Sequence, residues 1–223
     1  MATGGSVPVI AIDGPSASGK GTVAAKVAAA LGFHYLDSGA LYRLVALEAR
    51  RKGIETGDEA AVAALAAQLP ARFEGNEIFL EDRRVTDAIR TEECSAAASF
   101  VAALPKVRQA LLERQRAFRR PPGLVAEGRD MGSIVFPDAG LKVFLTASLE
   151  ARAERRHKQL KEKGIAATLA ALLQDLRERD ARDATRSAAP LKQSPGARQL
   201  DTTSMSAVQA AAQIVGWYRE GNR

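Results

Sequence analysis

The chain has 223 residues, which suits one sizeable α/β domain and leaves little room for two. Its single cysteine excludes an intramolecular disulfide, and its first residues lack the basic stretch of a secretory leader, so a cytoplasmic protein without a membrane anchor is expected. The net charge of +6 raises nucleic acid as a partner, but the arginine-rich stretches 108–120 and 152–186 are nearly free of aromatic residues. Nucleic-acid binding is therefore not expected.

The N-terminal segment predicts a strand, a glycine-rich loop and a helix in succession. Residues 7–13 form a short, β-branched apolar run typical of a buried strand. From Lys20 onward apolar residues recur at four-residue spacing, as on one face of a helix, until Gly32, which is a typical helix stop. The intervening residues 14–19 form the loop.

The rest of the chain alternates between the two periodicities. Strands are predicted at 35–38, 123–127, 141–146 and 198–202, and helices at 39–52, 58–69 with Asp58 as N-cap, 91–103, 106–119, 149–163, 168–184 and 206–219. The exception is the segment 72–85, whose alternation and Gly-Asn turn predict a small antiparallel hairpin. Strands that alternate with helices favour a parallel, doubly wound sheet.

The glycine-rich loop matches a phosphate-binding Walker A loop. Glycines allow backbone N–H groups to surround a phosphate chain, and the following helix adds its positive end. The expected ATP-binding residues are Gly14, Pro15, Ser16, Ala17, Ser18, Gly19, Lys20, Gly21 and Thr22. Gly21 occupies the usual Ser/Thr position, so Thr22 could reach Mg²⁺ directly or through water. The alternative is a glycine-rich turn without a function.

Further motifs resemble those of bacterial cytidylate kinases, in the same order and from about Val9 to Trp217. They are Asp37-Ser38-Gly39-Ala40-Leu41-Tyr42-Arg43, Arg114-Gln115-Arg116-Ala117-Phe118-Arg119, Glu127-Gly128-Arg129-Asp130-Met131-Gly132, and Arg179-Asp180-Ala181-Arg182-Asp183 followed by Arg186. The resemblance implies a P-loop NTPase-type α/β fold with a parallel five-stranded sheet flanked by helices. It implies one domain over residues 1–223, with a core at 7–38, 122–150 and 195–223, a monophosphate-binding insert at about 39–120 that contains the antiparallel patch, and a short helical lid at about 151–190.

The resemblance also implies a reaction. The γ-phosphoryl group of ATP would pass to CMP or dCMP, with Mg²⁺ bound mainly through phosphates and water, in a monomeric enzyme. Lys20, Arg129 and Arg186 would be catalytic. The implied substrate-binding residues are Ser38, Arg43, Ser99, Arg108, Arg129, Asp130, Arg179, Asp183 and Arg186.

Within this implied set, chemistry suggests a division of roles. The resemblance implies that Ser99, Arg108 and Asp130 contact cytosine, whose amino group can donate to a carboxylate and whose acceptors can accept from an arginine. Planar guanidinium groups such as those of Arg43, Arg129 and Arg186 suit a phosphate, because each can donate to two oxygens at once. Asp183 would accept hydrogen bonds from ribose hydroxyls.

Several of these residues also have ordinary structural interpretations. The segment 179–186 could be an exposed helix with ion pairs at i,i+3 and i,i+4 spacing. Arg152, Arg155 and Arg156 could be lid cations or a solvated helix face, and Ser99 could simply pack in a run of small residues.

The chemistry of the acceptor leaves two rival functions open. A phosphate monoester is largely dianionic at neutral pH, so it needs no general base, whereas an alcohol acceptor would use an aspartate such as Asp37 or Asp130. The first rival is a P-loop kinase for UMP, dTMP or a small alcohol such as shikimate. The second is a nucleotide-binding, RNA-associated ATPase.

Overall fold

The computed structural model describes residues 6–74, 77–162 and 164–221. The chain divides into two compact units. The first unit comprises Met1–Leu36 and Ala117–Arg223, and the second comprises Asp37–Arg116. The second unit covers nearly the residues that were predicted to form the monophosphate-binding insert, whose binding role stays a prediction.

A five-stranded sheet with the order β2-β6-β1-β7-β8 forms the centre of the first unit. Its strands are β1 (Val9–Asp13), β2 (His34–Asp37), β6 (Leu124–Gly128), β7 (Leu141–Thr146) and β8 (Arg198–Asp201). β1 pairs in parallel with β6 and β7, and β7 pairs in parallel with β8. Every residue of β1 and β6 is buried, which explains why these strands are continuous apolar runs without alternation. The predicted fold class is confirmed.

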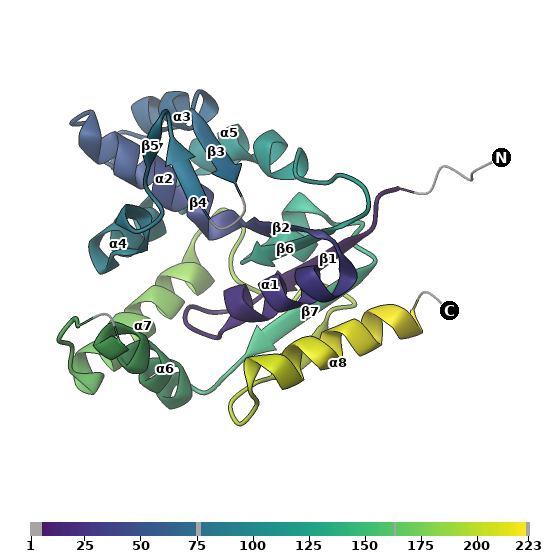
Figure 1. Cartoon of the computed structure of the whole chain (residues 1–223). Helices are drawn as coiled ribbons and strands as arrows, with labels where there is room; N and C mark the ends of the chain where they lie inside the picture. Colours follow the sequence, from purple (N-terminus) through teal and green to yellow (C-terminus); the bar gives the residue numbers. More distant parts are fainter. Residues whose placement is uncertain (1–5, 75–76, 163, 222–223) are drawn as a thin grey trace. The chain divides into compact units, whose positions relative to one another are not determined.

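Two pairs of helices accompany this sheet (Figure 1). The helices are α1 (Lys20–Leu31), α6 (Leu149–Glu162), α7 (Leu169–Thr185) and α8 (Ala207–Glu220). α1 and α8 pack side by side against the sheet, where Val23, Val27 and Ile214 join the same buried cluster as Ile12. α6 and α7 form a separate pair with a small apolar core of their own. The lid function predicted for this pair stays a prediction.

Capping residues mark the ends of two of these helices: Gly32 was predicted as a helix stop, whereas the cap at Ser206 was not predicted. α1 ends at Gly32, which adopts the left-handed conformation with φ of 66° and donates its N–H to the last turn. α8 begins after Ser206, whose hydroxyl accepts from the backbone of Gln209 while the Gln209 side chain accepts from the backbone of Ser206. This reciprocal capping box satisfies backbone N–H groups that a helix start leaves without partners.

The second unit combines helices with a three-stranded antiparallel sheet of order β3-β4-β5. Its elements are α2 (Ser38–Arg51), α3 (Glu59–Ala67), β3 (Ala71–Glu74), β4 (Glu77–Leu80), β5 (Arg83–Arg84), the 3₁₀ turn η1 (Ala88–Arg90), α4 (Glu92–Val101) and α5 (Pro105–Arg116). α2 packs on α4 and α3 on α5. The predicted hairpin is confirmed with an added short strand, although its Gly-Asn turn lies outside the described residues. Asp58 caps α3 as predicted, accepting from the N–H of Ala61.

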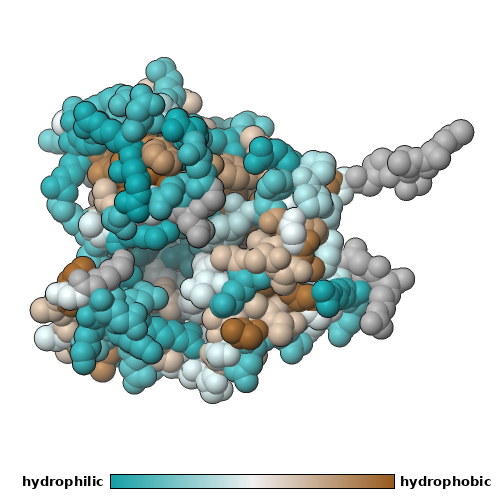
Figure 2. Space-filling model, viewed as in Figure 1, coloured by the Kyte–Doolittle hydropathy of each residue, from teal (hydrophilic) through white to brown (hydrophobic). Residues whose placement is uncertain are grey.

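The two units differ in the surface that they present in Figure 2. Hydrophilic residues predominate over the second unit, whereas more apolar residues are visible over α1 and α8 of the first. In the part of the chain that is described, no helix is long and apolar enough to cross a membrane.

Two short elements differ from the sequence prediction. The 3₁₀ turn η1 and the π-helical turn η2 (Met131–Val135) have no hydrophobic periodicity that would predict them. α5 also ends at Arg116, three residues before the predicted end, while Pro105 forms its first residue, where a missing N–H costs nothing.

The buried centre of the first unit supports a stability prediction. Ile12 is fully buried within the sheet, so Ile12→Ala should lower the free energy of unfolding by about 2–5 kcal/mol through lost burial and a residual cavity. Val208 is 63% exposed, and Val208→Ala should change it by less than about 0.5 kcal/mol. Urea unfolding of both variants tests this, and equal effects would contradict it.

Candidate active site

The phosphate-binding loop lies between the end of β1 and the start of α1, and its geometry requires glycine at its first position. A Cβ atom on Gly14 would lie 2.1 Å from the backbone oxygen of Leu145 in β7, so a side chain cannot be accommodated there. Gly19, the N-cap of α1, has φ of 88°, and Ala17 also adopts positive φ. The loop predicted from the sequence is thus a tightly curved backbone against β7.

Cationic side chains hold this loop through its carbonyl oxygens. Lys20 Nζ donates to the oxygen of Pro15 at 3.0 Å. From α6, Arg152 donates to the oxygen of Ser16 at 3.1 Å and Arg155 to the oxygen of Ser18 at 3.2 Å. Three carbonyl oxygens of the loop, those of Pro15, Ser16 and Ser18, therefore have cationic donors, which fixes the shape of the loop.

The contacts of Arg152 and Arg155 exclude a solvated helix face for these two residues of α6, and the lid role stays a prediction. Arg152 is buried and also donates to the oxygen of Ala147 and to Asp180 at 2.6 Å. Arg155 also donates to Thr202. These two arginines support the loop and do not form a solvated face. Their supporting role depends on contacts with residues distant in sequence, so it could not be predicted.

Lys20 is a buried cation whose charge is only partly compensated. Its Nζ lies 3.8 Å from the carboxylate of Glu127 at the end of β6. Burial, together with the charge of the nearby Arg129, lowers the pKa of Lys20 to about 7, and Glu127 acts in the opposite direction. An anion placed beside Lys20 would favour its charged form.

Arg129 links three segments that are distant in sequence. Its Nη2 donates to Ser16 Oγ of the loop at 2.8 Å, and its Nε donates to Asp183 of α7 at 2.7 Å. Burial alone would lower the pKa of Arg129, but Asp183 outweighs it and the pKa is raised. Burial would likewise raise the pKa of Asp183, but Arg129 holds it below its usual range. Both side chains therefore stay charged.

Two aspartates of α7, Asp180 and Asp183, form ion pairs with arginines of other elements. Asp183 pairs with Arg129, and Asp180 pairs with Arg152, both from other elements. Arg186 lies 3.9 Å from Asp183 and also donates to the oxygen of Ala189. The interpretation as an exposed helix with only local ion pairs is therefore wrong for these aspartates. Arg179 is half-buried on the same helix and contributes to the charge environment of Lys20.

The remaining predicted residues of the first unit differ in exposure. Asp130 follows Arg129 and is buried. Thr22 is exposed on the first turn of α1. Gly21 precedes it, and a Cβ there would lie 3.2 Å from the carboxylate of Glu127 and 3.5 Å from the hydroxyl of Tyr35. These two side chains therefore approach the helix at the residue that usually carries a hydroxyl.

The predicted residues of the second unit form their own arrangement. Asp37 caps α2 by accepting from the N–H of Ala40 and pairs with Arg43 at 2.6 Å. Arg108 of α5 donates to the oxygen of Ala102 at 3.0 Å and lies over the ring of Tyr42, 5.6 Å from its centre. Ser38 and Ser99 are buried on α2 and α4.

Two carboxylates near the loop were not predicted as site residues. Glu127 faces Lys20, and Asp13 accepts from the N–H groups of Met131 and Gly132. Asp13 is the last residue of β1 and Glu127 the penultimate residue of the neighbouring β6, so both lie at the edge of the parallel sheet where α/β proteins bind ligands. That position is the sequence signal that could have identified them.

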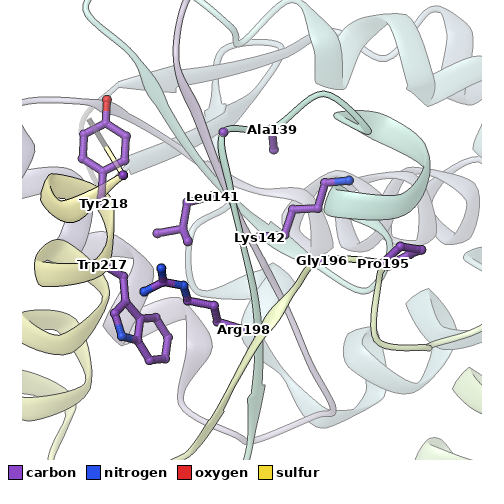
Figure 3. A pocket seen from close by; sticks show the side chains of 10 residues that line it. Ala139, Leu141, Lys142, Pro195, Gly196, Arg198, Trp217 and Tyr218 are labelled. Carbon is purple, nitrogen blue, oxygen red and sulfur yellow. The ribbon is translucent and has the colours of Figure 1, made fainter. Parts of the chain in front are cut away.

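A shallow cavity of about 260 Å³ lies elsewhere in the first unit and contains none of the predicted site residues (Figure 3). Lys142 of β7, Arg198 of β8 and Trp217 and Tyr218 of α8 line it. Because Leu141 and Arg198, which also line the cavity, begin β7 and β8, the cavity lies at the opposite edge of the sheet from the loop.

Comparison with known proteins adds to this geometry. The family model for cytidylate kinase matches residues 10–220. The chain belongs to the cytidylate kinase family. It is 60% identical to the cytidylate kinase of Chromobacterium violaceum over 214 residues, covering 96% of each chain, and 57% identical to that of Bordetella bronchiseptica over 218 residues, covering 98% of each. A solved gluconokinase structure from Sinorhizobium meliloti 1021 shares 17% identity over 97% of this chain and 94% of that chain, with a TM-score of 0.47.

For this member of the cytidylate kinase family, the lowered pKa of Lys20 predicts a proton linkage. With a pKa of about 7, roughly half of Lys20 is neutral at pH 7 without nucleotide, and triphosphate binding should restore its charge. Binding of Mg²⁺-ATP should therefore take up roughly half a proton at pH 7.

Calorimetric titrations in buffers with different ionisation enthalpies measure this uptake. Lys20→Arg is the matched control, because an arginine stays charged throughout and the uptake should vanish. Proton release by the natural protein, or equal uptake by both proteins, would contradict the assignment.

Proposed function

We propose that this chain transfers the γ-phosphoryl group of ATP to CMP or dCMP, giving ADP and CDP or dCDP, in pyrimidine nucleotide metabolism. Its membership of the cytidylate kinase family makes it a nucleotide-binding phosphotransferase. The observation that carries the proposal is the position of Arg129, hydrogen-bonded to Ser16 of the phosphate-binding loop and to Asp183 of α7.

The charges around Arg129 favour an acceptor that is itself an anion. Lys20 and the loop amides suffice for a triphosphate, but Arg129, Arg179 and Arg186 all lie within the charge environment of Asp183. Guanidinium groups placed next to a triphosphate site can offset the repulsion between two phosphate-bearing substrates. The phosphate of CMP has a second pKa of about 6, so it is largely dianionic at neutral pH and can act as a nucleophile without a general base.

We assign the residues accordingly. Lys20, Arg129 and Arg186 act on the transferring phosphoryl group, and residues 14–22 bind ATP. Cytosine is bound by Ser99, Arg108 and Asp130. The acceptor phosphate is bound by Arg43, Arg129 and Arg186, and the ribose by Asp183, with Ser38 and Arg179 as further contacts. The remaining role of the chain is to orient both substrates and exclude water during transfer.

The residues present fit a magnesium ion that is held mostly by the substrate. Across the described residues, no group of three acidic, histidine or cysteine side chains could hold a metal alone. The carboxylate of Glu127 beside Gly21 could accept hydrogen bonds from water around the ion, and the exposed Thr22 hydroxyl is also within the first helical turn. When bound, Mg²⁺ would neutralise charge on the β- and γ-phosphate oxygens.

The rival functions are not favoured. Relatives named as cytidylate kinases match almost the whole chain, whereas a small-alcohol kinase or an RNA-associated ATPase has no comparable support. We further propose that the enzyme acts as a monomer in the cytoplasm, where a single buried thiol such as Cys94 stays reduced.

A panel of acceptors tests the function. ADP formation from Mg²⁺-ATP should be fastest with CMP and dCMP, slower with UMP and negligible with AMP or shikimate. Lys20→Ala should lower kcat with CMP by about 10²–10³-fold, because a buried cation opposite the transferring phosphate is lost. Efficient shikimate phosphorylation, or normal turnover by Lys20→Ala, would contradict the proposal.

A second variant tests the role of Arg129 in acceptor binding. Arg129→Lys removes the fork that reaches both Ser16 and Asp183, so the KM for CMP should rise about tenfold while the KM for ATP changes little. Arg198→Lys at the opposite edge of the sheet is the control and should leave both constants unchanged. An unaltered KM for CMP in Arg129→Lys would show that this side chain does not bind the acceptor.

A further inference from the structure

Asp13 is a buried carboxylate at the last residue of β1, directly before the phosphate-binding loop, and only 3% of it is exposed. Its Oδ1 accepts from the N–H of Met131 at 2.8 Å, and its Oδ2 accepts from the N–H of Gly132 at 2.9 Å. Both donors begin η2, immediately after Arg129 and Asp130. The two oxygens together hold this turn in one orientation relative to β1.

The same carboxylate is in an unfavourable environment, which argues that its charge serves a purpose. Burial raises the pKa of Asp13 to about 6, although the two backbone hydrogen bonds act in the opposite direction. Among the charged groups that face it, Asp130 also raises the pKa and Lys20 lowers it. At neutral pH Asp13 is therefore mostly ionised, and both oxygens are available as acceptors.

We propose that Asp13 is a positioning residue for acceptor binding: it fixes the turn after β6 so that Arg129 and Asp130 keep their place beside the phosphate-binding loop. This inference rests on the proposed function of those two residues. The register of the sheet supports it, because Asp13 lies opposite Gly128, the residue before Arg129. A change at Asp13 therefore acts on Arg129 through the backbone.

The loop itself is held by other contacts, so the effect should be selective. Arg152 and Arg155 donate to loop carbonyl oxygens, and Lys20 donates to a third, independently of Asp13. Disturbing the Asp13 contacts should consequently impair binding of the acceptor more than binding of ATP.

Steady-state kinetics of Asp13→Asn test this selectivity. The asparagine side chain has one acceptor oxygen, which can accept from only one of the N–H groups of Met131 and Gly132, and its NH₂ group then faces the other N–H. The kcat/KM for CMP should fall about 10- to 100-fold, while the KM for Mg²⁺-ATP stays within about threefold. Asp138→Asn, which alters an exposed carboxylate paired with Arg119, is the matched control and should change neither value. Equal losses toward both substrates, or no loss, would overturn the proposal.

The pH dependence supplies a readout that a merely structural role would not move. Below about pH 6 Asp13 gains a proton and one oxygen stops accepting, as in the variant. The ratio of kcat/KM for CMP between the natural protein and Asp13→Asn should therefore fall toward one as the pH drops through this value. The ionisation of CMP is common to both proteins and cancels. A ratio independent of pH would count against the positioning role.

A measurement without substrate keeps the proposal testable even where Asp13→Asn does not fold. In NMR spectra of the nucleotide-free natural protein, the amide protons of Met131 and Gly132 should titrate together with a midpoint near the pKa of Asp13, about 6. Amides that do not respond overturn the proposal. If the protein does not phosphorylate CMP, the proposed function is wrong. The amide titration does not depend on CMP, so its result tells the failure of the positioning role apart from the failure of the proposed function.

Discussion

The hydrogen-bonded contact of Arg129 with Asp183 and Ser16 is the interaction on which the rest of the site in the first unit depends. It joins the end of β6, the phosphate-binding loop and α7 through one partly buried guanidinium group. Since burying an unpaired charge is very costly, the position of Asp183 decides whether this arginine can stay inside.

The ion pair of Arg129 with Asp183 also affects the electrostatic environment of the other charged groups nearby. Asp183 also influences Arg179 and Arg186, so one carboxylate serves several cations, and Arg129 in turn helps to lower the pKa of Lys20. The result is a positive potential that is already assembled before a ligand arrives. A site of this kind needs little rearrangement of its dipoles when negative charge enters, which is the basis of electrostatic catalysis.

The features that the sequence predicted are those that depend on neighbouring residues. β1 and β7 are short apolar runs, α1 is followed by a glycine, and the cap of α3 is Asp58, all of which act within a few residues. The loop was equally predictable, because its glycines and Lys20 are contiguous. What could not be predicted needs partners from distant segments: η2 depends on Asp13, more than one hundred residues earlier, and the inward position of Arg152 depends on the loop and on Asp180. Similarly, the spacing of Asp180 and Asp183 fits local pairs as well as distant ones, so sequence periodicity left both possibilities open.

The three-stranded sheet of the second unit has a consequence for how the protein behaves at high concentration. Its outer strands β3 and β5 are four and two residues long, and charged, exposed side chains stand on both: Arg72 and Glu74 on one, Arg83 and Arg84 on the other. Long, flat and apolar outer strands recruit strands from other molecules, whereas short and charged ones resist such pairing. The short, charged outer strands therefore disfavour pairing of this sheet with another molecule. The ion pairs of Arg72 with Glu74 and of Arg84 with Glu77 hold these charged side chains in position.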